Sequence, residues 1–101
     1  MSNERLAIDV RYLPITREVE IRLDDLSGLL YKVDRLEMLK WTGEELVEIQ
    51  KPSDEDLSDV RVWGGGDSIY WPKLEQVFAI ADLMAGIYGR PAWMEKLSVS
   101  A

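Results

Sequence analysis

Three consecutive glycines between two strand-like segments constrain the fold of this chain more than any other feature. Gly64–Gly66 separate Val-Arg-Val-Trp (residues 60–63) from Ser-Ile-Tyr-Trp (residues 68–71). Glycine supplies the positive φ angles that tight turns require, so the segment predicts a β-hairpin. If Trp63 pairs with Ser68, one face is apolar, with Val62 facing Ile69 and Val60 facing Trp71, while Arg61 and Tyr70 pair on the other. We therefore expect Trp71 in the core.

The same glycines do not match a phosphate-binding loop. A P-loop requires Gly-x-x-x-x-Gly-Lys-Ser/Thr, and no Lys-Ser or Lys-Thr pair follows these glycines. The dinucleotide-binding fingerprint requires a third glycine where Ile69 stands, and a helix where the second strand begins. We therefore interpret the glycines as a turn.

Alternating apolar residues predict further strands near the N-terminus. Leu6, Ile8, Val10 and Tyr12 alternate with other residues in the first of them, which Pro14 ends. Residues 18–23 form the second strand, with Val19, Ile21 and Leu23 as its apolar positions. Turn residues 24–28 then lead into a third, short strand over residues 29–33, which returns beside the second.

The middle of the chain predicts short helices. Asp34 is an N-cap candidate for a helix that carries Leu36 and Leu39. Ser53, with Asp56 three residues later, resembles a capping box and predicts one helical turn over residues 54–58. Residues 42–52 fit either a helical turn or a short extended piece, and the pattern does not decide between them.

The C-terminal part predicts one longer helix and a final turn. Pro72 ends the second strand of the hairpin, and a linking stretch follows. Apolar residues then have helical spacing over residues 80–88, with Gly89 placed to end that helix. Residues 92–97 are expected to add a helical turn.

Together these elements predict a single α+β domain over residues 1–101. Its small antiparallel sheet consists of two hairpin-like units, and short helices from the middle and the C-terminus cover one face. No apolar run approaches the roughly 20 residues that span a bilayer. The N-terminus also lacks the basic start and apolar stretch of a signal peptide. We expect a cytoplasmic protein that does not bind membranes.

The composition argues against catalysis. The chain has no histidine and no cysteine, which excludes Ser-His-Asp and Cys-His nucleophiles and the usual zinc and haem ligands. Asp54, Asp56 and Asp59 resemble a calcium loop, but Asp59 and Gly65 stand where an EF-hand requires glycine and glutamate. We expect a protein that is not an enzyme and has no cofactor and no metal ion.

The negative charge is concentrated in one segment. The net charge is −7, and residues 42–59 contain seven acidic residues and one basic residue, Lys51. An acidic surface repels a phosphate backbone, so we expect no direct binding of nucleic acid. A small, basic protein is the partner that this charge favours.

Several motifs between Glu20 and Gly86 resemble a known bacterial family. They are the acidic turn in Ile-Arg-Leu-Asp-Asp (residues 21–25), then Arg-Leu-Glu-Met-Leu (35–39), Ser-Asp-Glu-Asp-Leu (53–57), Ile-Tyr-Trp-Pro-Lys-Leu (69–74) and Leu-Met-Ala-Gly (83–86). The layout is similar to the family catalogued as domain of unknown function 2442. The chain departs from the family pattern at residues 75–78, which are less acidic, and in an acidic insertion near residues 41–52.

The resemblance implies a role in binding rather than a reaction. The family has no established activity. Some members accompany a second small protein in arrangements that resemble toxin–antitoxin pairs, which implies an antitoxin-like protein-interaction domain here.

Acidic and aromatic residues are the candidates for partner binding. Trp41 and Trp63 are the aromatic anchors expected at the surface, because aromatic residues are enriched at interface hot spots. The full candidate set is Trp41, Glu44, Glu45, Glu48, Asp54, Glu55 and Trp63. Two alternatives remain open. The chain could be a self-associating structural subunit, a homodimer joined through strand edges and exposed aromatics, or it could bind a small ligand.

Overall fold

A computed structural model of the chain describes residues 5–99. Strands and short helices alternate along it in the following order: β1 (Ala7–Leu13), β2 (Glu18–Leu23), β3 (Gly28–Lys32), the 3-10 turn η1 (Val33–Arg35), β4 (Leu39–Trp41), β5 (Leu46–Glu48), α1 (Asp54–Ser58), β6 (Arg61–Trp63), η2 (Gly64–Gly66), β7 (Ser68–Trp71), β8 (Gln76–Ala79), α2 (Ile80–Met84) and α3 (Pro91–Val99). The expected α+β class, with antiparallel strands and short helices, is confirmed.

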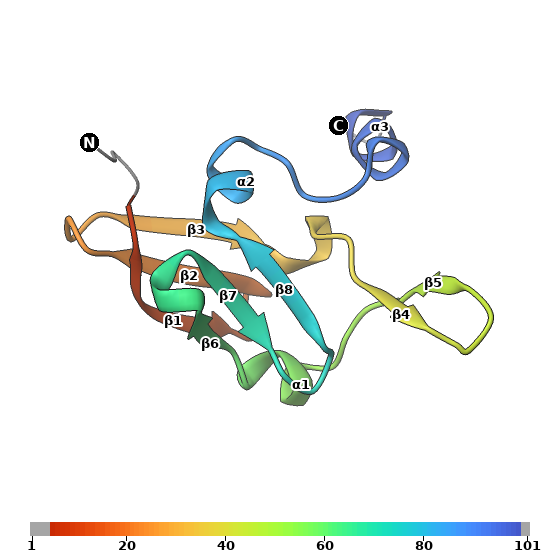
Figure 1. The fold of residues 1–101 in the computed structure, drawn as a ribbon, viewed down its shortest axis with the longest axis horizontal. Helices are drawn as coiled ribbons and strands as arrows, with labels where there is room; N and C mark the ends of the chain where they lie inside the picture. Colours follow the sequence, from red (N-terminus) through yellow and green to blue (C-terminus); the bar gives the residue numbers. More distant parts are fainter. Residues whose placement is uncertain (1–4, 100–101) are drawn as a thin grey trace.

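The strands form two three-stranded antiparallel sheets, β1-β2-β3 and β6-β7-β8, and a separate two-stranded hairpin, β4-β5. In Figure 1 the first sheet lies behind the second, and β4-β5 extends away from both. One buried cluster runs between the two sheets and includes Val19, Ile21, Leu23, Ile69 and Trp71. The inner faces of both sheets therefore share one core.

The first sheet has the three predicted strands, but β1 presents a different face from the expected one. The β1–β2 register shifts between Ala7 and Asp9. This irregularity reverses the alternation at the start of the strand. Ala7 is buried and Ile8 is exposed, whereas Tyr12 faces the core as expected. Strict alternation from Leu6 was therefore the wrong prediction for this end of β1.

The glycine-rich hairpin has the predicted register. Arg61 pairs with Tyr70, Val62 with Ile69 and Trp63 with Ser68. The glycines form the turn with φ angles of 63°, 70° and 105°. Trp71 is fully buried, and its indole N–H donates to the carbonyl oxygen of Leu57 at 2.8 Å. The turn interpretation of the three glycines is confirmed.

Strand β8 was not predicted. It pairs with β7 where the sequence indicated only a linking stretch. Its inner side chain, Phe78, lies 5.7 Å from Trp71 in an edge-to-face arrangement. The stretch that was interpreted only as a link is therefore an edge strand followed directly by α2.

Of the predicted helices, α1 is present as expected, the one after Asp34 is absent and the one over residues 80–88 is shorter. Ser53 caps α1, accepting a hydrogen bond from the Asp56 N–H at 3.1 Å, as predicted. The helix expected after Asp34 was wrong, because residues 33–35 make a single 3-10 turn and Leu39 begins β4. The helix predicted over residues 80–88 covers only Ile80–Met84 in the structure.

The C-terminal helices differ from prediction in where they stop. Helix α2 ends at Met84, and Gly86, with φ of 78°, makes the left-handed turn that had been assigned to Gly89. Gly89 instead allows close packing, since a Cβ there would lie 2.6 Å from Glu37 Cβ. The turn predicted over residues 92–97 exists and extends into the longer α3.

Candidate protein-docking surface

Residues 39–48 form a hairpin that includes the first part of the segment, residues 42–52, that the sequence left undecided. Leu39 pairs with Glu48, Lys40 with Val47, and Trp41 with Leu46. In the turn, the Thr42 N–H donates to the Glu45 carbonyl oxygen at 3.0 Å, and the Thr42 hydroxyl oxygen accepts from the N–H groups of Glu44 and Glu45. The extended alternative is therefore correct, and the hairpin projects from one end of the molecule (Figure 1).

The base of the hairpin is fixed to the body. Leu39 N–H donates to the Gln76 Oε1 at 3.2 Å, and the Gln76 side-chain amide donates in return to the Leu39 carbonyl oxygen at 2.5 Å. Ile49 N–H donates to the Met38 carbonyl oxygen at 2.9 Å. Glu48 lies 3.7 Å from the ammonium of Lys96 on α3. The hairpin is held at its base by β8 and α3, while its turn extends outward.

The outer half of the hairpin carries an exposed apolar pair. Trp41 is 64% exposed and Leu46 is 54% exposed. Residues directly opposite each other in an antiparallel pair project from the same face, so the indole and the leucine form one continuous patch. A two-stranded hairpin buries little apolar surface by itself, and this one leaves its largest side chains in solvent.

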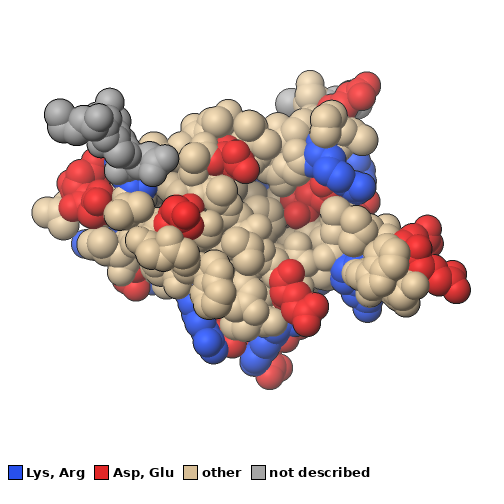
Figure 2. Space-filling view, viewed as in Figure 1, with Lys and Arg blue, Asp and Glu red and all other residues tan. Residues whose placement is uncertain are grey.

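Two carboxylates border this patch. Glu44 and Glu45 lie in the turn and are exposed, and acidic atoms gather at the outer end of the projecting hairpin in Figure 2. Among residues 5–99, no basic side chain forms an ion pair with either glutamate. The tip therefore presents negative charge next to an exposed indole.

Asp54, another acidic residue of the segment, is engaged elsewhere in the fold. Asp54 accepts hydrogen bonds from the Tyr12 hydroxyl at 2.6 Å and from Arg17 at 3.3 Å. Burial, followed by the hydrogen bond to Asp54, raises the pKa of Tyr12 to about 12. Arg17 also holds Asp34 through two hydrogen bonds, at 2.8 and 2.9 Å. This network joins β1, η1 and α1, so Asp54 has a structural role.

The candidate residues thus fall into three groups. Trp41, Glu44, Glu45 and Glu48 share the hairpin, and Glu48 is already paired with Lys96. Asp54 and Glu55 lie on α1, in the body of the molecule.

Trp63 forms the third group, on β6. It is 51% exposed and packs against Tyr70 with ring centroids 4.7 Å apart. In Figure 1 the hairpin lies at the opposite side of the molecule from β6 and η2. The structure therefore does not bring the two tryptophans into one surface.

Two residues of this site are absent from the candidate set. Leu46 completes the apolar patch, and Gln76 fixes the base of the hairpin. Leu46 has a local signal, because a turn over residues 42–45 would place it opposite Trp41. The role of Gln76 has no such signal, since its bonds to Leu39 join residues that are 37 positions apart.

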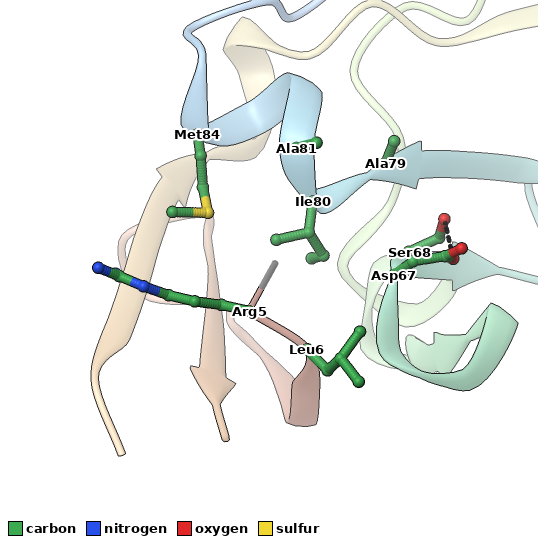
Figure 3. Close-up of a pocket in the computed structure, with 8 residues that line it drawn as sticks. All are labelled: Arg5, Leu6, Asp67, Ser68, Ala79, Ile80, Ala81 and Met84. Atoms are coloured by element: carbon green, nitrogen blue, oxygen red, sulfur yellow. Dashed lines mark hydrogen bonds between the residues drawn. The ribbon is translucent and has the colours of Figure 1, made fainter. Parts of the chain in front are cut away.

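A hollow of about 430 Å³ offers the alternative, a small-ligand site. Figure 3 shows it between the start of β1, the η2–β7 corner and α2, with Leu6, Ile80 and Met84 in its wall. Its polar side chains are already paired. The Ser68 hydroxyl donates to Asp67 at 2.9 Å, and Arg5 lies 3.2 Å from Asp25. This wall offers apolar contact and no unpaired polar anchor for a ligand.

Two other kinds of site are absent from residues 5–99. No group of three or more acidic residues is arranged to hold a metal ion. In the same part of the chain, no helix is long and apolar enough to cross a membrane.

A solved structure shares this architecture. The crystal structure of a protein of unknown function from Rhodospirillum rubrum ATCC 11170 matches with a TM-score of 0.71 and 29% sequence identity, covering 91% of this chain and 99% of that chain. No family model and no curated protein matches the chain. The comparison supports the α+β fold and assigns no activity to it.

Proposed function

We propose that this chain is a non-enzymatic, antitoxin-like protein-interaction domain that docks a small, basic protein partner through the β4-β5 hairpin. The observation that carries the proposal is the exposed Trp41–Leu46 pair on a projecting hairpin with an acidic turn. The resemblance to domain of unknown function 2442 supports a binding role of this kind. The proposal places the protein in the cytoplasm, with no cofactor.

The chemistry of the hairpin defines what its partner should look like. An indole at the centre of an interface contributes through burial, and the exposed part of Trp41 is large enough to supply about 2–4 kcal/mol. Glu44 and Glu45 favour lysine or arginine at the rim, where charge governs specificity and association rate. The partner segment should therefore combine an apolar residue with neighbouring basic residues.

A library of random displayed peptides, selected on the wild-type domain at low ionic strength, tests this chemistry. We expect selected peptides that combine an apolar residue with lysine or arginine and that bind less tightly as salt rises. The double variant Trp41→Ala plus Leu46→Ala should lower their affinity about 30-fold or more. Selected peptides that bind this variant unchanged would refute the docking site.

A matched pair of charge variants separates local charge from net charge. Glu44→Lys plus Glu45→Lys changes the net charge by four units from −7, and so does Asp24→Lys plus Glu95→Lys. All four side chains are exposed. Only the hairpin variant should weaken the selected peptides substantially. Equal weakening by both variants would show that net charge, and not the hairpin, attracts the peptides.

A further inference from the structure

Strand β3 is an open edge of the first sheet. It pairs with β2 on one side, and no backbone hydrogen bond from Gly28–Lys32 to any other described element is formed. At the opposite edge of the same sheet, β1 lies against β6. Open edges are commonly protected by proline, a bulge or a central charge. Gly-Leu-Leu-Tyr-Lys has none of these within it and has a single lysine at its end.

The register shows which backbone groups face outward. Leu23 N–H donates to the Ser27 carbonyl oxygen at 2.9 Å, and Val33 N–H donates to the Arg17 carbonyl oxygen at 3.0 Å. Hydrogen-bonded and non-hydrogen-bonded pairs alternate along an antiparallel ladder. Residues 29 and 31 therefore bond to β2, and the N–H and C=O groups of residues 28, 30 and 32 point away from the sheet.

From this geometry we infer that two copies of the chain pair through β3, antiparallel and centred on Leu30. The pairing joins the two sheets into one six-stranded sheet across a two-fold axis. Leu30 lies opposite Leu30 of the second copy, and Gly28 lies opposite Lys32. On the inner face Leu29 lies opposite Tyr31, and both are partly buried against the core.

The side chains explain why a second copy fits this edge. Leu30 is 52% exposed, and self-pairing covers it with its own counterpart. The apolar residues meet on both faces, and Lys32 meets a glycine that leaves it room. The outer face of β2 and β3 is also balanced in charge, with Arg22 and Lys32 alongside Glu18 and Glu20.

The local charge of the β3 edge differs from that of the proposed docking hairpin. Two hairpin tips would bring glutamates against glutamates, which disfavours self-association there. The β3 edge carries no such excess, so a copy of the same acidic chain can approach it. A dimer through β3 leaves the hairpin accessible to a partner. The dimer can therefore form whether or not the hairpin binds a basic protein.

Sedimentation of the full chain at increasing concentration tests the dimer. Because a five-residue edge is a small interface, we expect a reversible, concentration-dependent monomer–dimer equilibrium. Leu30→Lys places two ammonium groups at the axis and should raise the dissociation constant about tenfold or more. Val77 is a matched control, since it is 52% exposed on the outer face of β8, another edge strand. Val77→Lys should leave the dimer unchanged.

Cysteine cross-linking fixes the register even if Leu30→Lys perturbs folding. The chain has no cysteine, so Leu30→Cys introduces a single thiol. Hydrogen-bonded partners in an antiparallel pair have Cα atoms about 5.5 Å apart, within the range of a disulfide. Oxidation should give a disulfide-linked dimer of Leu30→Cys and far less of Val77→Cys. A monomer at all concentrations, dissociation by Val77→Lys alone, or equal cross-linking of both cysteine variants would overturn the inference.

Discussion

Replacing Trp71 with phenylalanine should destabilise the domain by about 3 kcal/mol. The indole N–H donates to the Leu57 carbonyl oxygen at 2.8 Å in a buried site. That carbonyl belongs to the last turn of α1, where residue 61 is already in β6 and does not continue the helix. An unpaired buried carbonyl costs about 1–3 kcal/mol, and the lost ring atoms add roughly 1–2 kcal/mol. Domains of this size are stable by only about 5–15 kcal/mol.

Urea unfolding followed by far-UV circular dichroism measures this loss. Fluorescence is less suitable, because the chain contains four tryptophans. A loss of 3 kcal/mol should lower the midpoint by about 1–3 M urea without changing the slope. Trp63→Phe is the control, since Trp63 is half exposed and has no such bond, and its midpoint should change far less. Equal midpoints for the Trp71 variant and wild type would refute the assigned role of the Leu57 bond.

Two further predictions concern the glycine turn and the pH dependence of stability. Gly66→Ala should cost about 2–4 kcal/mol in urea unfolding, because φ is 105° and a Cβ would lie 2.8 Å from the Ala7 carbonyl oxygen. Gly65→Ala, at φ of 70° with open space around it, should cost only about 1 kcal/mol. Hydrogen bonds from Arg90 hold the pKa of Glu37 below its ordinary value of 4.5. The corresponding stability is complete above about pH 4.5 and is lost as pH falls through the folded pKa. Glu37→Gln should therefore be less stable than wild type at pH 7, and unfolding curves should show that difference shrinking towards pH 3.

Features with a local chemical signal were predicted well. The hairpin register follows from matching the two flanking strands, because shifting by one residue would place Val62 opposite a serine and expose the apolar row. The capping of α1 by Ser53 is equally local, since the Ser53 hydroxyl oxygen and the Asp56 N–H that donates to it lie three residues apart. In both places neighbouring residues determine the geometry without help from the rest of the fold.

Features decided by distant contacts were missed. Strand β8 exists because β7 offers an open edge and Trp71 offers a surface for Phe78, and neither is visible in the residues of β8 themselves. The end of α2 was misplaced because both Gly86 and Gly89 suit a helix terminus by spacing. Gly89 packs closely against Glu37, which is a tertiary contact. Gly89 is therefore needed for this close approach and does not end the helix.

In the acidic segment, a count of charged residues does not reveal which carboxylates are already paired within the fold. The sequence shows seven acidic residues close together, but the fold pairs several of them internally: Asp54 with Tyr12 and Arg17, Asp59 with Arg61, and Glu48 with Lys96. A carboxylate already hydrogen-bonded in the fold would lose those bonds on binding a partner, so its net contribution to affinity is small. Glu44 and Glu45 lose nothing of this kind. A basic partner should therefore depend on Glu44 and Glu45 far more than on Glu48, Asp54 and Asp59, whose carboxylates the fold already pairs.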